Sequence, residues 1–454
     1  MGQFERFNFK SMEEIKAKIG ELGANITLQE DLSPLAQPVQ IGPFTAPNAM
    51  AVLPMEGCDA ERDGSPSELL KRRYHRFASG GAGLLWYEAC AVVEEGRANP
   101  LQMWMHGGNV KLFAEMLAEN NRLAVDKNGA RPVSIVQLTH SGRYSRPVDK
   151  AAPMVPQHDP LLDPRVGLAP DAPVVTDEYL DALQEKYVAA AILAQEAGFD
   201  GVDIKACHRY LVSELLASHT REGKYGGSFE NRSRFLLEVA RKVRKACGEN
   251  FIVASRFNVY DAHPYPYGFG VDKEEMWKED FTEPMELARR LVEAGANLLS
   301  NSAGNPYYRF PQVTRPFDTP AIGGEVPEEH PLESIARLFE FTRRIQKAAG
   351  EVPVIGNGYT WLRQFLPYAG AANLADGSVK MVGIGREAFA YPDAPRDILN
   401  HGKMEPNKCC IACSKCTQIM RDHGRTGCVI KDSAVYAPLY KQYRSAMENA
   451  VGTH

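Results

Sequence analysis

Four cysteines near the end of the chain have the spacing of a metal site, Cys410-x2-Cys413-x2-Cys416-x11-Cys428. Three thiolates three residues apart can wrap one face of an iron–sulfur cubane, and a fourth from beyond a glycine-containing turn can complete it. Zinc is the main alternative, although zinc modules more often use two separated Cys-x2-Cys pairs. The pattern therefore favours a [4Fe-4S] cluster, with Cys409 as a rival to Cys410 for the first ligand.

A second group of chemically capable residues follows short apolar segments that are typical of β-strands. The carboxyl ends of parallel barrel strands meet at one mouth, so these residues are expected to surround one site. Glycines at two such positions let backbone N–H groups approach an anion, and an arginine adds a fork of donors, which predicts a phosphate site. The residues after the strands are Pro54, Met55, Glu56, Glu88, Ala89, Gln137 to His140, Lys205 to His208, Arg256, Ser302, Gly356, Asn357, Gly358, Gly385 and Arg386.

One pattern recurs from residue 40 onward and supplies the elements that must position these residues. A helix leads to a small-residue turn with glycine and then to a short apolar strand, and eight such units predict an α/β fold, a (β/α)8 TIM barrel. The strands lie in GGAGLLWYEA (80–89), AGFDGVDIKA (197–206), AGANLLSNSAG (294–304), DGSVKMVGIGREA (376–388), MAVLP, PVSIVQ, FIVASR and VPVIGNG.

The domain organisation follows from where this pattern begins and ends. We expect an N-terminal helical extension over residues 1–37, the barrel over 38–400 and a cysteine-rich tail over 401–454. The extension is expected to dock on the barrel or on another subunit of a homo-oligomer. Ser11 and Glu14 predict the start of its helix, and Thr176 predicts the start of the helix before the fourth strand. Two long connections, 141–175 and 260–280, are expected to overhang the mouth as lids.

Composition excludes several classes of protein. The chain has 454 residues, 44% of them hydrophobic, and a net charge of −5 without a block of like charge. Nucleic acid and membranes are therefore unexpected partners, and the start of the chain lacks the apolar stretch of a signal peptide. We expect a soluble cytoplasmic protein, in which crowded cysteines indicate metal ligation before disulfides.

Four segments resemble the old yellow enzyme family of FMN barrels. They are QLTHSGR (137–143), HRYLVSELLASHTREGKYGGSFENRSRF (208–235), VASRF with Arg256, and GIGREAFAYPD (383–393). The cysteine tail is similar to that of the iron–sulfur branch, which includes 2,4-dienoyl-CoA reductase and trimethylamine dehydrogenase. The resemblance spans about residues 38 to 400 and implies an FMN barrel followed by a [4Fe-4S] cluster.

The resemblance also implies roles for the residues at the mouth. Gln137 would bond the flavin pyrimidine edge, and Arg256 would place a permanent charge beside N1 and O2, where reduced flavin accumulates negative charge. The remaining residues divide between the ring and the phosphate. Pro54, Met55, Glu56 and Ala89 would lie beside the isoalloxazine, and Gly356, Asn357, Gly358, Gly385 and Arg386 would hold the ribityl phosphate.

The substrate side departs from the family pattern. Ene-reductases of this family end the fourth strand with two donors, His-x-x-Asn or His-x-x-His, which grip the substrate carbonyl oxygen. Here Lys205 replaces the first donor, and His208 keeps the second, so the two would hold a carbonyl or a carboxylate oxygen of the substrate. Tyr210 stands at the position of the family's proton donor, well suited to protonate carbon. Arg209 stands where the family usually has a small residue, and Glu56 stands where relatives often have a small polar residue or cysteine that tunes the flavin. The sequence therefore leaves the polarity of the pocket undecided.

Three functions follow as hypotheses. The first is reduction of an activated C=C bond of an α,β-unsaturated carbonyl compound. The second is oxidation of an amine or another C–H donor, with an aromatic bowl of Tyr265, Tyr267, Tyr307 and Tyr308 for a cation. The third is a non-catalytic redox-sensing barrel. No Gly-x-Gly-x-x-Gly turn follows Cys428, so we expect NAD(P)H to reduce FMN directly or a partner protein to deliver electrons through the cluster.

Overall fold

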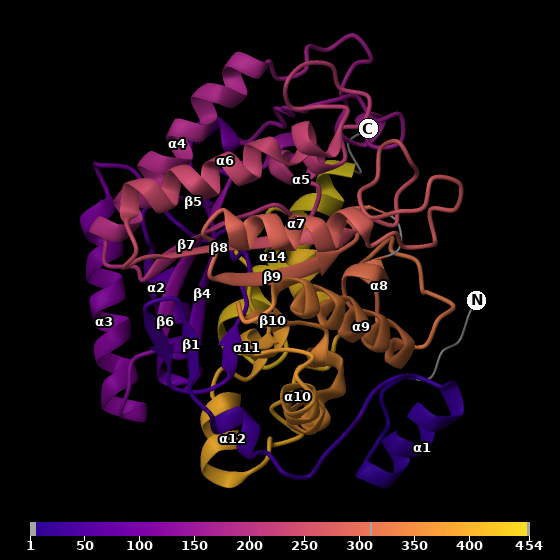
Figure 1. Cartoon of the computed structure of the whole chain (residues 1–454). Helices are drawn as coiled ribbons and strands as arrows, with labels where there is room; N and C mark the ends of the chain where they lie inside the picture. The colour runs from indigo at the N-terminus through magenta and orange to yellow at the C-terminus, as the bar shows by residue number, and fades with distance from the viewer. Residues whose placement is uncertain (1–5, 309–310, 452–454) are drawn as a thin grey trace.

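The computed structural model describes residues 6–308 and 311–451, and eight parallel strands within it close into a barrel (Figure 1). Closure is complete because the last strand pairs with the first and the first with the second. The predicted TIM barrel is therefore confirmed. Its strands are β3 (Met50–Val52), β4 (Leu84–Ala91), β6 (Val133–Thr139), β7 (Gly201–Ile204), β8 (Ile252–Tyr260), β9 (Leu298–Ala303), β10 (Val354–Gly356) and β11 (Met381–Ile384).

Alternating side chains divide the core of the protein in two. On β4, Leu84 and Trp86 belong to a cluster inside the barrel, whereas Leu85 and Tyr87 pack in the layer between the strands and the helices. This division is the consequence of the two-residue period of a strand that is buried on both faces. It explains why the strands are nearly continuous apolar segments in the sequence.

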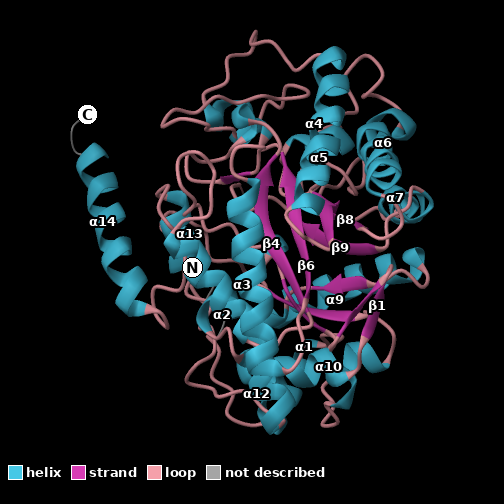
Figure 2. Ribbon diagram, turned by 90° about the vertical axis from the view of Figure 1, so that its left-hand side faces the viewer, coloured by secondary structure: helices cyan, strands magenta, loops and turns pink. Residues whose placement is uncertain are grey.

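A ring of helices covers the outside of the barrel (Figure 2). Thr176 accepts a hydrogen bond from Tyr179 N at 3.1 Å and so caps the helix before β7, as predicted. The ring consists of α2 (Glu68–Ser79), α3 (Val110–Asn128), α4 (Asp177–Glu196), α6 (Phe229–Cys247), α7 (Thr282–Glu293), α9 (Pro331–Ala349), α10 (Leu366–Ala375) and α12 (Ala394–His401). Shorter helices are α5 (Leu211–Leu216), α8 (Pro311–Thr314) and α11 (Arg386–Ala390).

The N-terminal region adds a helix and a hairpin. Helix α1 (Met12–Leu22) begins after Ser11, whose hydroxyl accepts from Glu14 N, and it packs against α9. The hairpin of β1 (Val39–Ile41) and β2 (Phe44–Ala46) was not predicted. Its residues Ile41 and Ala46 join the cluster inside the barrel, so the hairpin closes one end of the barrel. A further short strand, β5 (Met103–Trp104), pairs with the end of β4.

The two long connections are joined to each other by buried charges. Arg209, after β7, donates to Asp159 in the first connection at 3.3 Å and to Asp261 in the second at 3.0 Å. His263 Nε2 lies 2.7 Å from the same Asp159 carboxylate. Arg209 therefore holds both excursions at the carboxyl end of the barrel, and its guanidinium takes no part in the pocket described below.

The cysteine-rich tail packs on the barrel and ends in two helices, α13 (Lys415–Arg421) and α14 (Ser433–Val451). Both lie on one side of the barrel in Figure 2, with α14 outermost. Arg72 of α2 anchors the start of α14 through paired hydrogen bonds to Asp432 at 2.8 and 2.9 Å. Across the described ranges, no helix combines the length and apolar character that crossing a bilayer requires.

Candidate active site

A pocket lies at the carboxyl ends of the barrel strands. Strand-end residues were expected to share one site because parallel strands end at the same mouth, and the pocket brings most of them together. The predicted residues on its wall are Pro54, Met55, Glu56, Gln137, Lys205, His208, Arg256, Asn357, Gly358, Gly385 and Arg386.

Three other predicted residues do not line the pocket. Ala89 is buried within β4 opposite Gln137. A side chain at Gly356 would collide with Val379 and Tyr359, so this glycine permits close packing behind the pocket. Tyr210 is fully buried, but its hydroxyl reaches Glu56 and Tyr307 on the wall.

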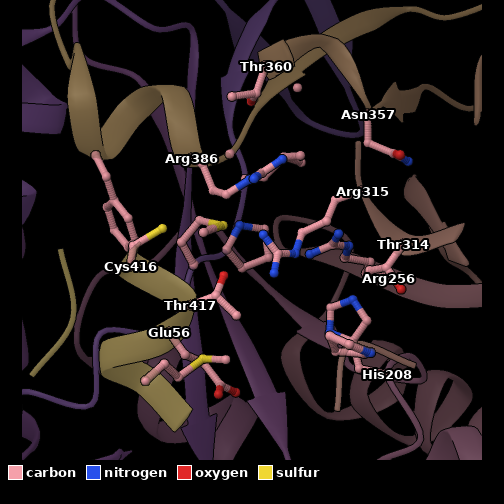
Figure 3. Close-up of a pocket in the computed structure, with 18 of the residues that line it drawn as sticks. Glu56, His208, Arg256, Thr314, Arg315, Asn357, Thr360, Arg386, Cys416 and Thr417 are labelled. Carbon is pink, nitrogen blue, oxygen red and sulfur yellow. The ribbon is translucent and has the colours of Figure 1, made fainter. Parts of the chain in front are cut away.

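Three arginines direct their guanidinium groups into this space (Figure 3): Arg256, Arg315 and Arg386. Sequence reasoning missed Arg315, which lies just after α8. Burial, together with the neighbouring charge of Arg386, lowers the pKa of Arg315 to about 9. Two guanidinium groups this close together in a partly enclosed site are stabilised by a bound anion.

Unpaired polar atoms show where an anion would bind. Arg386 donates from Nη2 to Pro316 O at 2.7 Å, while its Nη1 is buried without a hydrogen-bond partner among the described residues. Thr314 Oγ1 is similarly unpaired within that part of the chain. Gly358, with φ at +93°, also lies on this wall. The donor set therefore fits a phosphate group.

Gln137 and Arg256 line the pocket, and both donate hydrogen bonds to the buried Asp203 carboxylate. Gln137 Nε2 donates to Asp203 Oδ2 at 2.5 Å, and the backbone N–H of Arg256 donates to Asp203 Oδ1 at 2.8 Å. Burial raises the pKa of Asp203 to about 7. The Arg256 guanidinium itself makes no hydrogen bond or ion pair with the described residues, and its Nε is buried. It is free to bind a charged or polar edge of a ligand.

Glu56 and Lys205 line the pocket and form a connected network with the buried Tyr210. Lys205 Nζ lies 2.9 Å from Glu56 Oε1, and the Tyr210 hydroxyl donates to the same carboxylate at 3.1 Å. The ammonium also lies 3.7 Å from the centroid of the Tyr210 ring. Lys205 is thus ion-paired, but the pair stays inside the pocket. Burial, then the negative charge of Glu56, raises the pKa of Tyr210 well above its usual value, so its hydroxyl keeps its proton.

His208 lies beside Arg256 at the same mouth (Figure 3). Its Nε2 is 2.9 Å from Ser302 Oγ, and its backbone N–H donates to Asn258 Oδ1 at 3.1 Å. Burial lowers the pKa of His208 well below its usual value, and the charges of Arg256 and Lys205 lower it further. The imidazole is therefore neutral and can donate one hydrogen bond.

The four tyrosines considered for an aromatic bowl do not come together. Of these, only Tyr307 lines the pocket. Tyr308 packs against Arg165 and His263, and Tyr265 is 39% exposed. Tyr307 instead contacts Tyr144 and Tyr210, with ring centroids 4.4 and 6.2 Å away.

A second cavity lies within the cysteine-rich tail, and all four predicted ligands line it: Cys410, Cys413, Cys416 and Cys428. Cys409 does not line it, and its thiol contacts Glu405 O at 3.4 Å instead. Among the described residues, no three Cys, His, Asp or Glu side chains converge closely enough to hold one metal ion. Arg386, Phe389 and Cys416 border both cavities, so the two sites share a wall.

The tail also completes the first pocket, which the sequence did not predict. Thr417, Met420 and Thr426 line it beside Cys416. The backbone of Thr426 donates to Gly57 O at 2.7 Å, next to Glu56. The tail therefore supports the loop that carries Glu56.

A closed parallel barrel with a pocket lined by arginines at the carboxyl ends of its strands is the architecture of an α/β-barrel enzyme. Residues 34–292 match the model of the NADH:flavin oxidoreductase / NADH oxidase family, and the chain belongs to that family. Members of this family are flavin-dependent oxidoreductases that bind FMN and use NAD(P)H.

Curated relatives cover nearly the whole chain at modest identity. The chain is 28% identical over 380 residues to an NADH oxidase of Thermoanaerobacter brockii, covering 83% of this chain and 52% of the relative. It is 26% identical over 435 residues to a cinnamate reductase of Clostridium sporogenes, covering 89% and 58%. The chain thus spans about half the length of these relatives.

Among solved structures, a 2-naphthoyl-CoA reductase complex matches with a TM-score of 0.70 at 19% identity. The match covers 88% of this chain and 57% of that one. A histamine dehydrogenase from Rhizobium sp. 4-9 matches with a TM-score of 0.59 at 19% identity, covering 82% of this chain and 48% of that one. Both likenesses concern the fold.

Proposed function

We propose that this enzyme reduces the activated C=C bond of α,β-unsaturated carbonyl compounds. The observation that carries the proposal is the position of the Lys205 ammonium and the protonated Tyr210 hydroxyl on one buried carboxylate at the pocket wall. Reduction of such a bond needs a donor for the carbonyl oxygen and an acid for the adjacent carbon. Lys205 and Tyr210 supply the two kinds of group.

When bound, FMN would supply hydride to the β-carbon. Arg315, Arg386 and Gly385 would hold its phosphate, and Arg256 and Gln137 would face the edge of the ring. Lys205 and neutral His208 would hold the substrate oxygen on which negative charge develops. Tyr210 would donate the proton to the α-carbon, and the Tyr307 hydroxyl, 2.9 Å from that of Tyr210, would relay a replacement proton.

We propose further that the tail binds a [4Fe-4S] cluster through Cys410, Cys413, Cys416 and Cys428. A cubane is ligated by four thiolates that surround it, each on a different iron. The four thiols surround a cavity instead of converging on a point, which favours a cluster over a single tetrahedral zinc ion. The electron donor would be NAD(P)H at the flavin or a partner protein at the cluster.

Two alternative functions, amine oxidation and redox sensing, are distinguished from ene-reduction by the test below. An amine dehydrogenase would need a site for a cation, but Glu56, the carboxylate that lines the pocket, is already paired with the Lys205 ammonium. A redox sensor would bind both cofactors without turning over either class of compound.

Stopped-flow measurement of the two half-reactions tests the proposal. Lys205→Ala and Tyr210→Phe should slow flavin reoxidation by an unsaturated ketone about 100- to 1000-fold, the usual loss for a donor to a developing charge. Flavin reduction should change little in either variant. Tyr308→Phe is the control, because Tyr308 lies outside the pocket. Flavin reduction by amines, with no reoxidation by enones, would replace this proposal with amine oxidation.

A further inference from the structure

Glu56 is the carboxylate on the pocket wall, and its partners fix it in place. Its Oε1 lies 2.9 Å from Lys205 Nζ and 3.3 Å from Gln102 Nε2, and both of its oxygens accept from Tyr210. The side chains of Glu56 and Lys205 are only 11% and 3% exposed. An ion pair with so little solvent contact is weakly screened, so it strongly influences the charge of a ligand that binds beside it.

The backbone around Glu56 is equally constrained. The next residue, Gly57, donates to Glu88 Oε2 at 2.6 Å and accepts from Thr426 N at 2.7 Å. A side chain at Gly57 would collide with the Arg73 guanidinium, which is itself paired with Asp59 and Glu88. The carboxylate cannot easily withdraw from Lys205 to make room for another anion.

From this arrangement we infer that Glu56 determines which substrate charge the pocket accepts. Glu56 neutralises Lys205, so the pocket accepts uncharged unsaturated esters, thioesters, aldehydes and ketones and excludes free carboxylates. The inference rests on the proposed function and names the substrate class within it.

The charge balance of the substrate side supports this inference. Arg256, Arg315 and Arg386 are assigned to the cofactor, which leaves Lys205 as the cation that faces the substrate. Burial keeps His208 neutral, and it keeps Cys58, Tyr210 and Tyr307 in their protonated, uncharged forms, with Glu56 adding to the effect on these three. The remaining charges are one ammonium and one carboxylate, which sum to zero.

A neutral carbonyl and a carboxylate meet this pair differently. The Lys205 ammonium has three N–H donors, of which Glu56 Oε1 accepts one, so another can be donated to a carbonyl oxygen. A substrate carboxylate at the same place would lose its hydration and lie beside the Glu56 carboxylate without a cation of its own. The pair therefore binds an oxygen on which charge develops but rejects one that is already charged.

The test compares cinnamate with methyl cinnamate on the full chain reconstituted with FMN and reduced by dithionite, so that no physiological donor is needed. The wild type should bind and reduce the ester in preference to the acid. Glu56→Gln removes one charge with little change of shape and should shift the ratio of the two dissociation constants toward the acid by on the order of 100-fold, the effect of one nearby charge in a poorly solvated site. Glu61→Gln, at an exposed position of the same connection, should leave the ratio unchanged.

Each outcome has one meaning. Wild-type affinity for cinnamate that equals or exceeds that for the ester would overturn the inference without any variant. An unchanged ratio in Glu56→Gln would do the same while leaving ene-reduction intact. The double variant Glu56→Gln, Lys205→Met should lose the acquired affinity for cinnamate, because the cation responsible is gone. Reoxidation by neither compound, nor by enones and enals, would instead refute the proposed function.

Discussion

Replacing Arg315 by Met tests the phosphate site where its electrostatics are most unusual. The Arg315 guanidinium lies beside that of Arg386, and burial and this neighbour lower its pKa from its usual value to about 9. A shift of one pKa unit corresponds to about 1.4 kcal/mol. Partial exposure to solvent reduces the effect, so the charged Arg315 costs the apoprotein on the order of a few kcal/mol at neutral pH.

Arg315→Met is expected to act in opposite directions on the stability of the apoprotein and on the affinity for FMN. Because the pKa of Arg315 is lower in the folded chain, the folded state binds protons less well, and the cost is fully present below pH 9. Arg315→Met should therefore leave the apoprotein as stable as the wild type or more stable. The variant also loses a charged donor to phosphate, worth about 1.5–3 kcal/mol, so FMN should dissociate about 10- to 100-fold more readily.

Two measurements separate these effects. Thermal unfolding without FMN reports the cost to the apoprotein, and quenching of FMN fluorescence on titration reports the dissociation constant. Arg62→Met, at a surface ion pair with Asp149 whose arginine is 73% exposed, should change neither. An Arg315→Met protein with wild-type FMN affinity and a less stable apoprotein would refute the reasoning, because Arg315 would then be a structural residue.

Two further predictions concern the tail and a buried histidine. Cys413→Ala should remove the iron but leave FMN bound, because Cys413 borders only the tail cavity, whereas Cys416→Ala should also weaken FMN binding, because Cys416 borders both cavities. Iron analysis and FMN titration measure the two effects. Cys409→Ala is the control and should keep its iron, because Cys409 does not line the tail cavity. Burial lowers the pKa of His140 to about 3, and its Nδ1 accepts from Gly142 N at 3.0 Å. Its contribution to stability should be present above pH 6.5 and decline from there toward pH 3, and urea unfolding of His140→Gln should show a shallower decline over that range.

Strand periodicity made the barrel predictable. Each strand is a short apolar segment, all but β3 follow a turn with glycine, and a parallel strand buried on both faces has no other common location. The hairpin of β1 and β2 was not predictable in the same way. Its strands have three residues each, and what identifies Ile41 and Ala46 as core is their position at the end of a closed barrel.

Site residues that directly follow a strand could be predicted from the sequence. Contacts between residues far apart in the sequence could not, because they depend on how the elements are arranged in space. Lys205 and Glu56 follow different strands, 149 positions apart, and their pairing depends on how those strands sit around the barrel. Arg315 follows no strand directly, so no local pattern connected it with Arg386. The sequence left the role of Arg209 open, and its buried acidic partners draw the guanidinium toward the two long connections.

The shared wall between the two cavities links cofactor binding to substrate choice. Arg386 and Cys416 each border both spaces, and Thr426, between the third and fourth cysteines, holds the backbone beside Glu56. Ordering of the cysteine-rich segment around a cluster would therefore restrict the flavin pocket and the Glu56–Lys205 pair at the same time. A tail that only relayed electrons would need proximity to the flavin but no contact with the loop that carries Glu56. The contact at Gly57 indicates that the tail is also part of the structure that fixes the charge of the pocket.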